Sequence, residues 1–215
     1  MTPTENACMA KYLSALESNY KKGFFGKKDQ VGLIFQEFKG LEIYQIAAWP
    51  NTLHNVGLEI SNLFKFTNYP EANKAYNVKD IAILRVEPLK WWVIRIGSFE
   101  KNNLLKKNSD LEELFKKNID FKKSEKGTIL SLTNSRIHLR INGKSAVDLL
   151  NRHISIDLRE KSFPVNSLAT TNLHHCGVTL WRSNKGYELF LPVGFALSLW
   201  NILLESATQF GYEIK

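Results

Sequence analysis

The sequence repeats one pattern along most of its length: two strand-like segments joined by a short turn, followed by an amphipathic helix. From residue 31 onward this unit occurs four times. The expected strand pairs are 31–38 with 41–47, 81–86 with 91–96, 128–132 with 136–141, and 178–182 with 187–191. The helices that follow them are expected at about 51–63, 109–118, 145–152 and 195–210. Strands joined by tight turns pair antiparallel, so the pattern predicts an α+β protein with helices packed on largely antiparallel sheets.

Residues at the helix ends support these boundaries. Asn51 is a candidate N-cap directly after Pro50, because its side chain can accept a hydrogen bond from a free backbone N–H. Ser109 has the same role in the second helix, with Glu112 at the spacing of a capping box. Gly211 follows the last helix, where glycine readily adopts the positive φ that ends a helix.

The segment 136–141 alternates strictly between apolar and polar residues. Its apolar positions are Ile137, Leu139 and Ile141, and its polar positions are Arg136, His138 and Arg140. Successive side chains of a strand point to opposite faces, so the alternation predicts a sheet with one buried face. His138 is therefore expected to face outward, as a surface residue and not a catalytic one.

The length of 215 residues and the 44% hydrophobic content are sufficient for one sizeable core. Residues 1–28 predict an N-terminal helix and a basic arm. The helical pattern lies at Met9, Tyr12, Leu13 and Leu16, and the lysines follow it. Residues 29–215 are expected to form one α+β domain made of two fused halves, about 29–126 and 127–215.

Charge and cysteine content limit the partners. The net charge is +8, but lysine supplies most of it, whereas phosphate and base recognition favours the planar fork of arginine, so we expect no nucleic-acid partner. No apolar run reaches the roughly 18 residues that span a bilayer, so we expect no membrane partner. Cys8 and Cys176 belong to no CxxC pair, which favours a cytoplasmic protein without disulfides.

The sequence lacks the common motifs of catalytic and cofactor sites. Neither GxGxxG nor GxxxxGK[ST] occurs, so no glycine-rich turn is available to bring backbone amides close to a phosphate. HExxH and GxSxG are also missing. We therefore predict no catalytic, cofactor-binding or metal-binding residues in this chain.

Two local patterns resemble binding motifs but have simpler explanations. His174, His175 and Cys176 are potential zinc ligands, yet neighbours in a strand point to opposite faces, so the two histidines are poorly placed to chelate one ion. Lys185, Gly186 and Tyr187 resemble the start of an RNA-binding RNP1 segment, but the residues after them do not continue that pattern. A hairpin turn accounts for them.

Two adjacent tryptophans, Trp91 and Trp92, lie in one expected strand, so their side chains must point to opposite faces. Either both faces of the sheet are covered, or one indole contributes to a surface that contacts a partner. Burial of both is the expected outcome, because most large aromatic side chains are substantially buried.

The C-terminal part of the chain resembles a known family. The stretch from Thr128 to Leu158 is similar to the aminomethyltransferase-type module, with a strand, a polar turn and an "R..L.I.G..A...L" run. The matching positions are Arg136, Leu139, Ile141, Gly143, Ala146, Leu149, Leu150, Asp157, Leu158, Phe163 and Pro164. The run from Tyr187 to Pro192 and the helix after it, with Phe195, Ala196, Leu199, Trp200, Leu203 and Phe210, resemble the end of the sarcosine oxidase gamma subunit family.

This resemblance implies a fold like the folate-binding domain of aminomethyltransferases and the role of an accessory, non-catalytic gamma subunit. The implied complex is a heterotetramer with larger alpha and beta subunits and a small delta subunit. It would oxidise sarcosine to glycine, with tetrahydrofolate as the one-carbon acceptor. FAD, FMN, NAD and tetrahydrofolate are implied for the partner subunits, and no cofactor for this chain.

Two alternatives remain open at this point. One is a stand-alone folate-binding protein similar to aminomethyltransferases, which equilibrium folate binding by the isolated chain would distinguish. The other is the gamma subunit of a related N-methyl amino acid dehydrogenase. Nothing in the sequence separates the second alternative from a sarcosine oxidase subunit.

Overall fold

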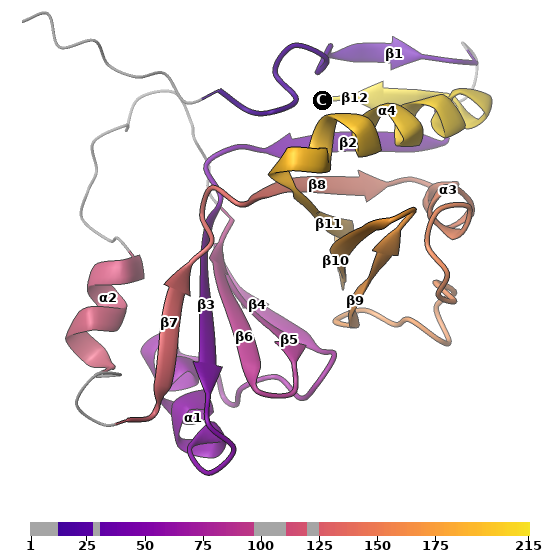
Figure 1. The fold of residues 1–215 in the computed structure, drawn as a ribbon. Coiled ribbons are helices and arrows are strands. Elements are labelled where there is room, and N and C mark those ends of the chain that lie inside the picture. The colour runs from indigo at the N-terminus through magenta and orange to yellow at the C-terminus, as the bar shows by residue number, and fades with distance from the viewer. Residues whose placement is uncertain (1–12, 28–30, 97–110, 120–124) are drawn as a thin grey trace, which may run out of the picture.

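The structure, a computed structural model, describes residues 13–27, 31–96, 111–119 and 125–215. It confirms the α+β class: a seven-stranded and a five-stranded sheet pack against each other, and helices lie on their outer faces (Figure 1). Among the described residues, no helix is long and apolar enough to cross a membrane.

The seven-stranded sheet collects strands from both ends of the chain. In spatial order its strands are β1 (Gly23–Phe25), β12 (Tyr212–Ile214), β2 (Leu33–Phe38), β8 (Arg136–Asn142), β11 (Gly186–Pro192), β10 (Cys176–Ser183) and β9 (Leu168–Leu173). Neighbouring strands are antiparallel except β12 and β2, which are parallel. Its outer face carries α3 (Ala146–Asn151) and α4 (Ala196–Ala207), with short 3-10 turns at Val193–Phe195 and Thr208–Phe210 on either side of α4.

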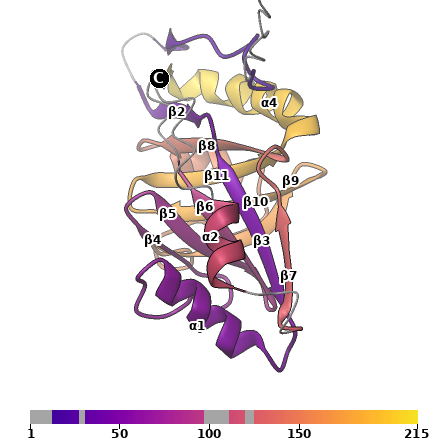
Figure 2. The same ribbon diagram turned by 90° about the vertical axis from the view of Figure 1, so that its left-hand side faces the viewer.

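The five-stranded sheet is entirely antiparallel. Its spatial order is β4 (Ala75–Val78), β5 (Ile81–Glu87), β6 (Lys90–Arg95), β3 (Glu42–Ala48) and β7 (Gly127–Ser131). The helices α1 (Leu53–Leu63) and α2 (Leu111–Asn118) lie on its outer face, on the same side of the molecule (Figure 2).

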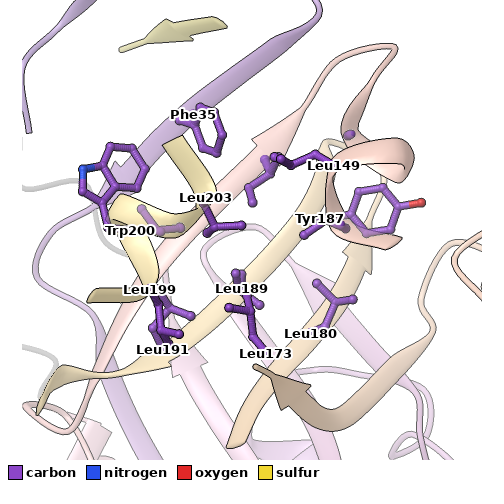
Figure 3. Packing of buried hydrophobic residues seen from close by; sticks show 14 of the residues in the cluster. Phe35, Leu149, Leu173, Leu180, Tyr187, Leu189, Leu191, Leu199, Trp200 and Leu203 are labelled. Carbon is purple, nitrogen blue, oxygen red and sulfur yellow. The ribbon is translucent and has the colours of Figure 1, made fainter. Parts of the chain in front are cut away.

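Three apolar clusters hold these layers together. The largest lies between the seven-stranded sheet and helices α3 and α4, where Leu199 and Leu203 of α4 face Leu191 and Leu189 of β11 (Figure 3). Trp200 of the same helix packs edge-on against Phe35 of β2. A second lies between the five-stranded sheet and its helices, and a third lies between the two sheets. Every strand with residues in two clusters is therefore covered on both faces.

The adjacent tryptophans show this double coverage. Trp91 is fully buried under α1 and α2, whereas Trp92 points to the other face and packs between the two sheets against Phe190. The expectation that both indoles are buried is confirmed.

Two of the four expected strand pairs are hairpins in the structure, and two are not. The pairs β5–β6 and β10–β11 are confirmed. The segments 31–38 and 41–47 do not pair, because β2 belongs to the seven-stranded sheet and β3 to the five-stranded one. The segments 128–132 and 136–141 are divided in the same way between β7 and β8. The short turns after β2 and β7 carry the chain from one sheet to the other.

These two crossings also interleave the sheets along the chain. The halves expected at about 29–126 and 127–215 do not correspond to the two sheets, since β2 joins the C-terminal strands and β7 joins the earlier ones. Either half alone would lack a strand of the sheet that it mainly builds. Hydrogen bonds between strands satisfy backbone groups that would otherwise remain unpaired, so each sheet needs both parts of the chain.

The terminal segments differ from expectation in detail. The described residues 13–22 form turns and not a helix, and β1 follows within the predicted basic arm, while Met9, Tyr12 and Ser109 lie outside the described residues. The first helix begins at Leu53, and Thr52 and not Asn51 occupies the N-cap position. The Thr52 side chain makes no capping hydrogen bond, and its hydroxyl instead donates to the backbone oxygens of Trp49 and Lys126. The helices expected at 109–118 and 145–152 are found at Leu111–Asn118 and Ala146–Asn151.

The final helix is found where it was expected. α4 continues as a 3-10 turn to Phe210, and Gly211 follows with a φ of 65°, so its predicted role at the end of the helical segment is confirmed. The strands β1, β4, β9 and β12 were not predicted, because they are short or rich in polar residues.

Candidate functional site

A charged cluster lies inside the seven-stranded sheet, on the face that packs against the five-stranded sheet. Glu188 of β11 is at its centre. One carboxylate oxygen, Oε1, accepts hydrogen bonds from Arg140 Nε at 2.7 Å and from Ser183 Oγ at 2.7 Å. The other, Oε2, lies 2.7 Å from His138 Nε2. The side chains of His138 and Glu188 are fully buried.

The partners of Glu188 decide its charge. Burial by itself would raise the pKa of the Glu188 carboxyl, since a low-dielectric environment disfavours the ionised form. Hydrogen bonds from His138 and Ser183, with the nearby charges of His138 and Arg140, outweigh burial and bring the pKa below its usual value. The carboxylate is therefore ionised at neutral pH, and it can accept a hydrogen bond from each of its three neighbours.

His138 corrects a prediction made from the sequence. It was expected at the surface, but it is fully buried and its ring stacks between Phe38 and Phe190, at centroid distances of 4.8 and 4.7 Å. The alternation along β8 correctly separated the two faces of the strand. The prediction failed because the second sheet covers the polar face as well.

One sequence signal pointed to this cluster. Glu188 lies in the otherwise apolar run Tyr187–Leu191, where its neighbours Tyr187, Leu189, Phe190 and Leu191 are all buried. A glutamate is almost never fully buried unless it is paired, so its position calls for a basic partner on a neighbouring strand.

Arg140 is held from two directions. Its Nε donates to Glu188, and its guanidinium carbon lies 4.4 Å from the centroid of the Phe38 ring. The Nη nitrogens have no hydrogen-bond partner among the described residues. The arginine side chain is 15% exposed, so it lies at the boundary between the buried cluster and solvent.

Arg140 opens onto a cleft of about 820 Å³ at the rim of the two sheets. The seven-stranded sheet contributes Arg140, Trp181 and Ser183 to its walls, and the turn between β4 and β5 contributes Lys79 and Asp80 from the other sheet. A smaller pocket of about 340 Å³ also has Arg140 in its wall. This is the candidate site, because polar groups from both sheets converge there.

The cluster is not arranged for nucleophilic catalysis. In a serine–histidine–acid triad the histidine lies between the hydroxyl and the carboxylate and removes the hydroxyl proton. Here the carboxylate of Glu188 lies between Ser183 and His138, so the histidine is not in contact with the hydroxyl. The arrangement instead fixes the position of Arg140 and keeps its counter-ion charged.

The histidines 174 and 175 are at a turn and not along a strand. His174 lies between β9 and β10 with a φ of 53°, and its Nε2 is 3.0 Å from Nδ1 of His153. Burial lowers the pKa of His153, and the charges of His174 and Arg152 lower it further. No group of three His, Cys, Asp or Glu side chains able to hold a metal ion is found within 13–27, 31–96, 111–119 and 125–215.

The segment Lys185–Tyr187 forms the turn and the first residues of the β10–β11 hairpin, as expected. Tyr187 is buried, and its hydroxyl donates to the backbone oxygen of Leu158 at 2.9 Å. It is thus a structural residue with no face open for stacking on a base.

Comparison with known proteins gives a consistent result. The chain is 30% identical over 90 residues to sarcosine oxidase subunit gamma of Corynebacterium sp. strain P-1, covering 41% of this chain and 44% of the relative. It is 34% identical over 68 residues to the same subunit of strain U-96, covering 32% and 33%. In sequence, the chain is similar to sarcosine oxidase gamma subunits. The alignments span less than half of the curated relatives, and no family model matches the chain.

Solved structures extend the likeness to nearly the whole fold. A chain of the heterotetrameric sarcosine oxidase from Corynebacterium sp. U-96 superposes with a TM-score of 0.72 at 19% identity, over 93% of this chain and 96% of that one. The glycine cleavage system aminomethyltransferase T from Bartonella henselae superposes with a TM-score of 0.57 at 12% identity, over 93% of this chain and 56% of that protein. The expected likeness to gamma subunits and to the aminomethyltransferase fold is confirmed.

Proposed function

We propose that this chain is an accessory, non-catalytic gamma subunit of a complex similar to heterotetrameric sarcosine oxidase. The observation that carries the proposal is the agreement of two likenesses. Curated gamma subunits share 30% and 34% identity with segments of the chain, and a sarcosine oxidase chain shares its fold over 93% of the length. The fold alone would not be enough, since one fold hosts many functions.

The cluster around Glu188 supports a non-catalytic role. The ring of His138 is stacked between two aromatic rings, and the hydroxyl of Ser183 donates to the carboxylate of Glu188 and not to the histidine. The sequence also has neither of the two glycine-rich phosphate-binding motifs, so its residues do not fit a flavin dinucleotide held in the usual way. The absence of a catalytic or cofactor-binding residue in this chain is part of the proposal.

The proposed partners are larger alpha and beta subunits and a small delta subunit. In the proposed complex they carry FAD, FMN, NAD and tetrahydrofolate, and the assembly converts sarcosine to glycine with tetrahydrofolate as the one-carbon acceptor. A cytoplasmic location belongs to the same proposal, because Cys8 and Cys176 form no pattern typical of a disulfide framework.

Purification of the tagged chain from its native host under gentle conditions tests this proposal. Mass spectrometry of the recovered material should find larger subunits in constant ratio to the chain. An unrelated protein with the same tag, purified from the same host, is the control. Recovery of the chain without partners would contradict the proposal.

A further inference from the structure

The cleft between the sheets contains an arginine that is fixed in place but not saturated with hydrogen bonds. Glu188 holds Nε of Arg140, and the ring of Phe38 covers one face of the guanidinium. Both Nη nitrogens remain without a partner in the part of the chain that the structure describes. A guanidinium oriented in this way loses little side-chain entropy when an anion binds to its free edge.

The lysines of the cleft add positive charge that is not neutralised nearby. Lys22, Lys79 and Lys185 all line it, and across the described residues no carboxylate lies within ion-pair distance of any of the three. They come from three separate parts of the chain. A cleft with one sign of charge on low-dielectric walls concentrates ions of the opposite sign.

The carboxylates of the cleft do not cancel this charge. Glu188 is bound to Arg140 and His138, and Asp80 lies 3.6 Å from Nε of Arg95. The third is Glu37, whose carboxylate accepts a hydrogen bond from the Ser14 hydroxyl. Arg95 also pairs with Glu42 at 2.8 Å, so it balances Asp80 only in part. Even with both Glu37 and Asp80 counted as negative, the three lysines, which are unpaired among the described residues, leave the remaining charge positive.

A buried donor in the wall of the cleft also lacks a partner. Trp181 is 1% exposed, and its Nε1–H makes no hydrogen bond to the described residues. An unpaired buried N–H costs about 1–3 kcal/mol relative to a paired one. The indoles of Trp91 and Trp200, away from the cleft, are unpaired among the described residues as well, so Trp181 serves as a reporter beside the cleft and the ligand is argued from Arg140 and the lysines.

We propose that this cleft is a binding site for a small organic oxyanion. The carboxylate or phosphate group of the ligand accepts hydrogen bonds from the Nη nitrogens of Arg140. The guanidinium fork matches either group in a bidentate way. Lys79 and Lys185 supply the balancing charge from opposite walls. The volume of about 820 Å³ lies within the range of about 300–1,000 Å³ that is usual for small-molecule pockets. This inference does not depend on the proposed function.

Calorimetric titration of the full chain with two probes at low ionic strength tests the site. Citrate represents the carboxylates and inorganic pyrophosphate the phosphates, and the tighter of the two identifies the class of ligand. We expect Arg140→Met to weaken the tighter probe by about tenfold or more, because a charged bidentate contact is lost. Arg140→Lys should give an intermediate affinity, since it keeps the charge without the fork.

Arg152→Met is the matched control. Its guanidinium also stacks on an aromatic ring, with the carbon 5.0 Å from the Phe210 centroid, but Arg152 is exposed and does not line the cleft. Its affinity for the probes should equal that of the unaltered chain. Equal affinities of the Arg140→Met and Arg152→Met variants would overturn the proposal.

Arg140→Met also removes a basic partner of the buried Glu188, which by itself lowers the stability of the fold. A second variant therefore changes the charge of the cleft without changing that pair. Lys185→Gln changes the β10–β11 turn at a side chain outside the buried cluster and should weaken the probe by about threefold. The indole N–H resonance of Trp181 should shift on titration. No heat and no shift with citrate or pyrophosphate would show that the cleft is not a small-molecule oxyanion site. Heat from an octa-aspartate peptide alone, added as a third probe, would lead to the same conclusion.

Discussion

Arg140 and Glu188 lie directly opposite each other on β8 and β11, and Nε of the arginine is 2.7 Å from Oε1 of the glutamate. The pair is fixed in the middle of the sheet by strand register, because β8 and β11 pair continuously from Tyr187 to Pro192. Glu188 also accepts hydrogen bonds from His138 and Ser183, so one carboxylate of β11 holds side chains from the strands on both sides of it, β8 and β10.

Replacing Glu188 by alanine should therefore lower the free energy of unfolding by about 3 kcal/mol. His138 and Ser183 would lose their acceptor in a buried environment, and Arg140 would lose its counter-ion. Chemical denaturation monitored by tryptophan fluorescence measures the loss. Glu205→Ala, on the exposed side of α4, is the control and should change the stability by less than about 0.5 kcal/mol. Equal effects of the two changes would contradict this account.

The lowered pKa of Glu188 makes stability depend on acidity in a defined direction. The unfolded chain binds a proton at Glu188 at a higher pH than the folded chain does, so acidification favours unfolding. The contribution is complete above the usual pKa of about 4.5 and is lost as the pH falls through the folded value. Glu188→Gln should flatten the decrease of stability between about pH 5 and pH 3. An equally steep decrease in the variant would show that other groups are responsible.

Tyr20 connects the N-terminal segment with β2 and β12 through its hydroxyl. The hydroxyl accepts the N–H of Glu37 at 2.7 Å and donates to the backbone oxygen of Lys215 at 2.9 Å. Tyr20→Phe should cost about 1–3 kcal/mol of stability, because the Glu37 N–H loses its acceptor and the Lys215 oxygen its donor. Thermal unfolding checks this, with Tyr76→Phe in β4 as a comparison for which no tyrosine hydroxyl bond is found among the described residues.

The same tyrosine predicts an alkaline transition. Burial raises the pKa of Tyr20 from 10.0 to about 12. The protonated hydroxyl is thus favoured in the folded state, so the contribution is complete below pH 10 and is lost as the pH rises toward 12. Spectrophotometric titration should find a tyrosine that ionises about two pH units later than free tyrosine, and this step should be absent in Tyr20→Phe.

Gly143 is the glycine of the run that resembles the aminomethyltransferase-type module, and its backbone conformation explains why a glycine is present there. Its φ is 115°, and a Cβ atom at this position would lie 2.3 Å from the backbone oxygen of Gly32. Gly143→Ala should reduce stability by more than about 1 kcal/mol, since the clash is with backbone that cannot move aside easily. Gly177→Ala is the matched control, because nothing lies within 4 Å of the added Cβ there. Similar melting temperatures for the two variants would refute the steric argument.

The sequence predicted local structure better than it predicted the sheet to which a strand belongs. The β5–β6 and β10–β11 hairpins and the end of the last helix at Gly211 followed from local patterns. The crossings after β2 and β7 did not, because two strand-like segments separated by a short turn look the same whether they pair or join different sheets. Only contacts with strands distant in the chain decide between the two arrangements.

The candidate site was missed for a related reason. Alternation along 136–141 correctly assigned His138 and Arg140 to one face, but it carries no information about what covers that face. The covering layer, the five-stranded sheet, is built mostly from residues 42–95. The buried charge of Glu188 within an apolar strand was the one local signal that the face is not solvent-exposed.

The most direct test of the central claim is the absorption spectrum of the material recovered with the tagged chain, before and after addition of sarcosine. A gamma subunit of a sarcosine oxidase-like complex should be recovered with flavin absorbance that sarcosine bleaches in the absence of oxygen, while the chain expressed alone shows no flavin absorbance. Stoichiometric flavin on the chain alone, or recovered material with no flavin at all, would contradict the account.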